Sequence, residues 1–230
     1  MGIRENLDIS AYLVIGPENT LGRPVGDVVA AAVAAGFTCI QVRSKVATAR
    51  ELVDYCREAA DAIAQAGDAS RVALLVDDRL DVVLAARAVG IKVDGVHVGQ
   101  KDIPVDVCRK YVGKDGIVGL SARADEMLEY VNTTDVSDID YFGVGPLHPT
   151  DTKPDCGLDA SGQLIVKTLD DIAELAQVSP VPIVVGGGVK AQDIPALRKT
   201  GAQGFFVVSA VCGADDPRAA ADELVQAWRA

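Results

Sequence analysis

The strongest constraint on this fold is a repeated alternation between short apolar runs and helical patterns. Eight runs rich in β-branched residues recur along the chain, and all but one are followed by a turn and a segment with helical periodicity. Several runs are continuously apolar, as is typical of parallel strands that are buried on both faces. The predicted strands are Tyr12–Ile15, Cys39–Val42, Ala73–Val76, Gly95–Val98, Ile117–Leu120, Tyr141–Val144, Ile183–Val185 and Phe205–Val208.

Helical patterns fill the intervals between these runs. The clearest spans Ala49–Gln65, in which Leu52, Cys56, Ala59 and Ile63 lie along one stripe. The other expected helices are Gly26–Ala35, Asp78–Val89, Asp106–Val112, Leu164–Ala176, Asp193–Thr200 and Pro217–Trp228.

Eight strand–helix units in 230 residues predict an α/β chain that forms one (β/α)8 TIM barrel domain over residues 1–230. Residues 1–10 are expected to form a short N-terminal extension. The competing architecture is an open, doubly wound sheet. The first predicted strand is followed by Gly16-Pro17-Glu18-Asn19, which lacks the G-x-G-x-x-G phosphate fingerprint, so the barrel is favoured.

Composition restricts the classes of partner. The formal net charge of −11 argues against a broad nucleic-acid surface, although a local positive pocket can still bind a small anion. The five cysteines include no C-x-x-C pair, which indicates free thiols in a reducing compartment. The sequence shows no signal-peptide pattern and no apolar run long enough to span a membrane. We therefore expect a cytoplasmic protein without a nucleic-acid or membrane partner.

Basic residues follow the second predicted strand, where a barrel of this class has its active site. Gln41, Arg43 and Lys45 alternate along the chain, so they point to one side. Arg binds phosphate groups bidentately and Lys binds them as a compact charge, which predicts a phosphate or diphosphate site. A solvent-exposed basic pair on a loop is the alternative.

Two aspartates follow neighbouring strands. Asp78 comes after the third predicted strand and Asp102 after the fourth, and adjacent strands lie roughly 4.8 Å apart. The two carboxylates can share a hard cation such as Mg²⁺, which takes one or two carboxylates plus substrate phosphate oxygens. The alternative for Asp78 is a helix N-cap. We interpret His97 as a buried structural histidine in preference to a base.

The loops after the last three predicted strands offer groups that bind anions. Residues 145–153 are rich in glycine and hydroxyls and end in Lys153, so this segment is either a lid over an anion or a plain connector. Gly186-Gly187-Gly188 let backbone N–H groups approach a phosphate, unless they only form a tight turn. Ser209 follows the eighth strand, and phosphate sites after strands seven and eight are frequent in this fold.

Taken in order, these motifs resemble the thiamine phosphate synthase family. They are Q-x-R-x-K, D-D-R, H-V-G-Q-x-D, G-x-S, D-Y-x-G-x-G-P-x-x-P-T-x-T-K, G-G-G and V-S-A, and the resemblance as a whole spans about Ala11 to Pro217. Members of that family are (β/α)8 barrels that join 4-amino-5-hydroxymethyl-2-methylpyrimidine diphosphate to thiazole phosphate and release diphosphate. The resemblance implies a Mg²⁺-dependent transferase of the alkyl- or aryl-transferring type. The substrate forms a carbocation-like centre as diphosphate departs, so no protein nucleophile is required.

The resemblance also implies a role for each matching residue. Asp78 and Asp102 would bind Mg²⁺. The pyrimidine diphosphate would be held by Gln41, Arg43, Lys45, Asp77, Ser121 and Lys153. The thiazole phosphate would be held by Thr150, Thr152, Gly188, Val208 and Ser209. The catalytic residues among these would be Arg43, Lys45, Ser121 and Lys153.

The chain departs from the usual family pattern at a few positions. Asp77 replaces Asn, Ala122-Arg123 replaces Thr-His, His148 replaces an aromatic residue, and Gly186 replaces an aliphatic one.

Three other functions compete with the synthase. A thiazole tautomerase on a similar barrel would use a histidine base, whereas this chain has Arg123. A non-catalytic barrel would bind thiazole phosphate without turnover. The function of other phosphate-binding barrels, such as ribulose-phosphate epimerases, does not explain the cations that are oriented toward a diphosphate. A homodimer is compatible with the sequence, which does not determine the oligomeric state.

Overall fold

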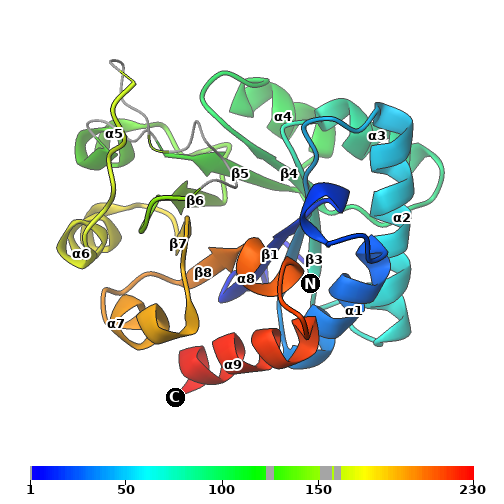
Figure 1. The fold of residues 1–230 in the computed structure, drawn as a ribbon. Helices are drawn as coiled ribbons and strands as arrows, with labels where there is room; N and C mark the ends of the chain where they lie inside the picture. The colour runs from blue at the N-terminus through cyan, green and yellow to red at the C-terminus, as the bar shows by residue number, and fades with distance from the viewer. Residues whose placement is uncertain (1, 123–126, 151–156, 158–161) are drawn as a thin grey trace.

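The computed structural model describes residues 2–122, 127–150, 157 and 162–230, and it forms a closed parallel barrel (Figure 1). Each strand pairs in parallel with the next, and β8 closes the sheet on β1. The predicted (β/α)8 barrel is therefore confirmed. The strands are β1 Ala11–Ile15, β2 Cys39–Val42, β3 Ala73–Asp77, β4 Gly95–Val98, β5 Ile117–Ser121, β6 Tyr141–Val144, β7 Ile183–Val185 and β8 Gly204–Val207.

Helices cover the outer face of this barrel, and α1 packs between α2 and α9 (Figure 1). The α-helices are α1 Val25–Ala35, α2 Ala49–Gln65, α3 Leu80–Ala88, α4 Val105–Val112, α5 Met127–Thr133, α6 Leu169–Val178, α7 Ile194–Arg198, α8 Ser209–Cys212 and α9 Pro217–Arg229. Two 3₁₀ helices, η1 Pro17–Asn19 and η2 Ala191–Asp193, lie in the loops after β1 and β7. In the described residues, no helix is long and apolar enough to cross a membrane.

The helix after β6 begins later than the sequence suggested. We expected it to start at Leu164, but α6 starts at Leu169. Thr168 caps this helix: its side chain accepts the Asp171 N–H at 3.1 Å, and the Asp171 carboxylate accepts the Thr168 N–H at 2.8 Å. This reciprocal capping box fixes the helix start more strongly than the apolar pattern before it does. The sequence analysis also did not predict the short helices α5 and α8.

The barrel interior is filled by side chains from alternate strand positions. Its buried apolar cluster contains Ile9, Tyr12, Val14, Cys39, Ala73, Leu75, Ile117, Tyr141 and Val184. Such a packed interior leaves no pore, so ligands have access only to the ends of the barrel. A second, larger cluster joins the outer faces of the strands to the surrounding helices.

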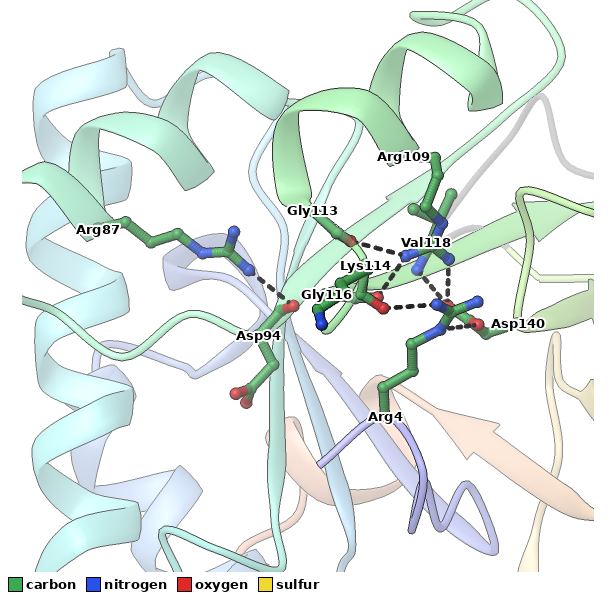
Figure 2. A network of polar contacts seen from close by, with 9 residues as sticks. All are labelled: Arg4, Arg87, Asp94, Arg109, Gly113, Lys114, Gly116, Val118 and Asp140. Atoms are coloured by element: carbon green, nitrogen blue, oxygen red, sulfur yellow. Dashed lines mark hydrogen bonds and ion pairs between the residues drawn. The ribbon is translucent and has the colours of Figure 1, made fainter. Parts of the chain in front are cut away.

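The N-terminal segment closes the amino-terminal end of the barrel. Ile3 and Leu7 pack against the interior cluster, and Ile9 belongs to it. Arg4 donates from Nε to Asp140 Oδ1 at 2.7 Å, and Arg109 Nη2 donates to the other carboxylate oxygen at 2.7 Å (Figure 2). Residues 2–10, which we expected to form a short extension, therefore pack against the barrel and close its amino-terminal end.

Candidate active site

Four polar side chains extend the inward-facing rows at the carboxyl ends of neighbouring strands. Asp77 on β3 is in register with His97 on β4, and His97 is in register with Gly119 on β5. Ser121 ends β5 two residues later, and Arg43 directly follows β2. Because alternate residues of a strand share a face, these side chains converge on the open end of the barrel.

Arg43 and Lys45 form a cluster of ion pairs with two aspartates. Arg43 Nε lies 3.1 Å from Asp77 Oδ2, and Lys45 Nζ lies 3.5 Å from the same oxygen. Lys45 also donates a short hydrogen bond to Asp78 Oδ2. Burial lowers the pKa of Lys45, but the hydrogen bond to Asp78 and the charges of both aspartates outweigh this, and the pKa lies above its ordinary value. Two cations are therefore held at the barrel rim as the Q-x-R-x-K spacing indicated.

Asp78 has a backbone conformation that is rare for a residue other than glycine. Its φ is +59°, and the Arg79 N–H donates to the Asp77 carbonyl at 2.6 Å, which closes a three-residue turn. The helix α3 begins at Leu80, and Arg79 is its N-cap residue without a side-chain capping bond. The alternative that Asp78 caps this helix is therefore wrong. A strained backbone that presents a carboxylate is typical of functional sites.

Asp102 lies beside Asp78, so the two carboxylates meet as their strand order predicted. Asp102 Oδ2 accepts the Gly99 N–H at 2.8 Å. Burial raises the pKa of Asp102, and the hydrogen bond and negative charge of Asp78 raise it further. Two adjacent carboxylates repel each other unless a cation or a proton lies between them. Although the described residues contain no cluster of three or more potential metal ligands, this pair fits Mg²⁺, which needs one or two carboxylates.

Gln41 places an unpartnered amide in the barrel interior. Its side chain is only 4% exposed, and its Nε2 has no hydrogen-bond partner among the described residues. A buried polar group of this kind costs about 1–3 kcal/mol unless a ligand or a water molecule satisfies it. Gln41 is therefore a hydrogen-bond donor available to a ligand.

A chain of hydrogen bonds crosses the barrel and ends at Ser121. Tyr12 bonds to Tyr141 through their hydroxyls at 2.8 Å, and Tyr141 bonds to His97 Nδ1 at 2.9 Å. His97 Nε2 then lies 2.9 Å from Ser121 Oγ. Burial raises the pKa of both tyrosines well above the ordinary value, so their hydroxyls stay protonated. His97 is half-buried and hydrogen-bonded on both sides, in agreement with its interpretation as a structural histidine.

Sequence reasoning did not identify the two tyrosines of this chain. The available signal was the position of each phenol in an otherwise apolar strand, because a buried hydroxyl requires a partner. Gln100 was also missed: its Nε2 donates to the Ser121 carbonyl and to the Tyr130 hydroxyl, each at 2.7 Å. Gln100 therefore holds the backbone of Ser121 while His97 contacts its side chain.

The three glycines after β7 are required by the packing of the protein itself. A side chain at Gly186 would overlap the ring of Phe206. A Cβ at Gly187 would lie 2.5 Å from Pro146, and one at Gly188 would lie 2.8 Å from the Cβ of His148. Gly187 and Gly188 also have positive φ values. The tight-turn interpretation of the G-G-G motif is thus sufficient to explain these residues. A role in binding phosphate would be additional to this structural one.

The remaining predicted residues divide into two sets. Thr150 is half-buried in the loop after β6, and the half-buried Val208 and the exposed Ser209 begin the turn into α8 after β8. Thr150, Gly188 and Ser209 thus follow β6, β7 and β8, which are neighbours in the barrel. Thr152 and Lys153, together with the departure at Arg123, lie outside the described residues.

Comparison with known proteins agrees with this geometry. Residues 11–211 match the family model described as thiamine monophosphate synthase. The thiamine-phosphate synthase of Corynebacterium efficiens is 39% identical over 97% of this chain and 96% of its own length. That of Corynebacterium jeikeium is 38% identical over 96% of this chain and 94% of its own length.

Solved structures give the same result. Thiamine phosphate pyrophosphorylase from Pyrococcus furiosus superposes with a TM-score of 0.78 at 28% identity, covering 99% of this chain and 98% of that one. A 3-hexulose-6-phosphate synthase superposes with a TM-score of 0.63 at 18% identity, covers 95% of this chain and 99% of that one, and shows the fold alone. The chain therefore belongs to the thiamine monophosphate synthase family.

Proposed function

We propose that this protein is a thiamine phosphate synthase. It would join 4-amino-5-hydroxymethyl-2-methylpyrimidine diphosphate to thiazole phosphate and release thiamine phosphate and diphosphate. The observation that carries the proposal is the grouping of Arg43, Lys45, Asp78 and Asp102 at one side of the barrel rim. Cations next to a pair of carboxylates suit a metal-bound diphosphate, whereas a simple phosphomonoester site needs no carboxylate pair.

The diphosphate would lie against Arg43 and Lys45, with Lys153 reaching it from the loop after β6. Asp78 and Asp102 would hold Mg²⁺, which supplies positive charge to the departing diphosphate. Asp77 would act through its ion pairs with the two cations, because a carboxylate that is already paired to both fixes their positions. We assign it to the diphosphate site on that basis.

The pyrimidine would lie deeper, where the hydrogen-bonding groups of the interior are directed. Gln41 offers its unpartnered amide, and Ser121 offers a hydroxyl that His97 orients. Breaking the bond between the methylene carbon and the diphosphate oxygen leaves a cation that the aminopyrimidine stabilises. The thiazole nitrogen then donates its electron pair to this carbon and forms the new bond. The chain contributes positioning and charge in both steps.

The thiazole phosphate would bind at the opposite side of the rim. Gly188, Val208 and Ser209 lie after β7 and β8, where phosphate sites are frequent in this fold, and Thr150 follows the neighbouring strand. Thr152 would complete this group of residues, which we call the phosphate cradle. The two phosphorylated substrates are thus assigned to separate sides of one pocket, with the reacting atoms between them.

The chemistry of the described side chains is consistent with a reaction that has no protein nucleophile. Burial raises the pKa of the Cys56 and Cys212 thiols to about 12 and that of Cys108 to about 11, so these cysteines stay protonated. His97 uses both ring nitrogens in hydrogen bonds, and His148 contacts Asp193. The two hydrogen bonds of His97 disfavour that residue as the base that the tautomerase alternative requires.

The partners of this enzyme would be its two small-molecule substrates. The net charge of −11 disfavours nucleic acid, and the four described cysteines are free, which supports a cytoplasmic location. A homodimer remains compatible with these properties.

The first test is diphosphate release by the purified protein. Release should require both substrates and Mg²⁺, should be accompanied by thiamine phosphate, and should largely disappear in an Asp102→Ala variant of unchanged fold. Absence of product from folded wild-type protein would contradict the synthase assignment and favour a tautomerase or a binding protein. Binding of thiazole phosphate without turnover would identify the second of these.

A further inference from the structure

The loop after β6 is joined to the turn after β7 by a contact between two side chains. His148 Nε2 lies 3.0 Å from Asp193 Oδ2. The side chain of His148 is 44% exposed and that of Asp193 is 16% exposed. This contact therefore connects two separate loops at the rim of the barrel, and its acidic partner is largely shielded from water.

Backbone hydrogen bonds bring the two loops together next to this contact. The Leu147 N–H donates to the Gly186 carbonyl and the His148 N–H donates to the Gly187 carbonyl, each at 2.9 Å. These bonds join the two loops just beyond the ends of β6 and β7. The loop after β6 consequently runs directly over Gly188, whose Cβ, if it had one, would lie 2.8 Å from that of His148.

Asp193 is a fixed partner for His148. It ends η2, and its Oδ2 also accepts the Lys190 N–H at 2.9 Å. The next residue, Ile194, is fully buried and begins α7. Because the backbone on both sides of the carboxylate is anchored, the position of Asp193 determines where the imidazole of His148 can lie.

We propose that the His148–Asp193 contact is a clamp that makes His148 a positioning residue for the thiazole phosphate. Thr150 follows His148 by two residues, and Gly188 lies under the same loop. The clamp holds these two parts of the proposed phosphate cradle at a fixed separation, so the substrate does not have to order the loop when it binds. This inference rests on the proposed function, because it takes the thiazole phosphate to lie beside Thr150, Gly188 and Ser209.

The test is steady-state kinetics of four clamp variants with both substrates varied. His148→Phe keeps a planar ring without a hydrogen-bond donor, and Asp193→Asn keeps an oxygen that can accept the Lys190 N–H. Each should raise the KM for thiazole phosphate about threefold to fivefold, as expected for the loss of one partly exposed polar contact. The kcat and the KM for the pyrimidine diphosphate should stay within about twofold of wild type. The double variant should be no worse than the poorer single variant, and His148→Gln, which retains a donor, should recover most of the affinity.

Two further variants distinguish a failure of the clamp proposal from a failure of the proposed thiazole phosphate site. Arg218→Gln removes a more exposed ion pair outside the candidate site, Arg218–Asp222 on α9, and should leave every kinetic constant unchanged. Ser209→Ala tests the phosphate cradle without touching the clamp. A raised KM in Ser209→Ala, with unchanged values in His148→Phe and Asp193→Asn, would overturn the clamp alone. Additive effects in the double variant would also overturn it. An unchanged KM in Ser209→Ala would contradict the proposed thiazole phosphate site and the clamp together.

Discussion

The two ends of the barrel use arginine and aspartate in different ways. At the amino-terminal end, Asp140 accepts hydrogen bonds from Arg4, Arg109 and the Val118 N–H, each at 2.7 Å (Figure 2). At the carboxyl end, Arg43 also pairs with an aspartate, Asp77. There, however, the buried amide nitrogen of Gln41 has no hydrogen-bond partner among the described residues.

The difference lies in how the charged and polar groups are arranged. At the carboxyl end, two carboxylates lie side by side, Asp78 has a strained backbone, and the buried amide nitrogen of Gln41 has no hydrogen-bond partner among the described residues. At the amino-terminal end, one carboxylate is surrounded by three donors. We propose that ligands complete the first arrangement. In the second, Arg109 Nε also lacks a partner, but the same guanidinium donates to Asp140 and to the Gly113 and Gly116 carbonyls. Substitutions at the two ends should therefore affect different properties.

The largest effect is expected for Arg43→Met at the carboxyl end. Loss of the guanidinium should reduce kcat/KM by about 100-fold or more, because it removes the charged group that we propose stabilises the leaving diphosphate. Stability should also fall, since the buried Asp77 loses the guanidinium with which it pairs. Combining Arg43→Met with Asp77→Asn should restore the melting temperature but not the activity. Recovery of both would show that Arg43 is structural.

The next effect is expected for Asp140→Ala at the amino-terminal end. Removing the carboxylate leaves the largely buried Arg109 without its charged partner and should lower the free energy of unfolding by about 2–3 kcal/mol. Urea denaturation measures this loss. The kcat/KM of the folded enzyme should stay within about twofold of wild type, because the candidate active site lies at the other end of the barrel. A tenfold fall in kcat/KM would show that the two ends are coupled.

A smaller effect on both properties is expected for Tyr141→Phe, which lies between the two ends. The missing hydroxyl leaves Tyr12 and His97 without their shared partner, which should cost about 1–2 kcal/mol of stability. Because His97 contacts Ser121, the KM for the pyrimidine diphosphate should rise severalfold while the KM for thiazole phosphate stays unchanged. Tyr12→Phe is the matched control: it removes a hydroxyl that does not touch His97. An equal effect of Tyr12→Phe on the KM would contradict a role for the orientation of His97.

The smallest effect is expected for Arg4→Gln. The Arg4 side chain is 31% exposed, and Asp140 keeps Arg109, so the loss of stability should be about 1 kcal/mol or less. Thermal unfolding should show a shift of a few degrees with unchanged kinetics. A larger loss would mean that the Arg4 contacts with Asp140 and the Lys114 carbonyl stabilise the fold more than a partly exposed ion pair does.

Local sequence features predicted much of the site. The alternation within Gln41–Lys45 placed Gln41 and Arg43 in one inward-facing row, and the order of the strands brought Asp78 next to Asp102. Both inferences need only the strand period and the neighbouring position of consecutive strands. The helix-cap alternative for Asp78 failed because a positive φ at that residue, which no propensity indicates, moves the helix start to Leu80.

What the sequence by itself determined is the set of strands, their order and the residues that face the interior. These follow from periodicities within a few residues of each other. Tertiary structure alone decided the contacts that span the closed barrel, such as Tyr12 with Tyr141, Arg4 with Asp140, and the clamp between His148 and Asp193. These pairs are 45 to 136 residues apart in the chain, and only barrel closure and register bring them together. The chemistry available to each residue could therefore be predicted from the sequence, but the partner that orients the residue could not.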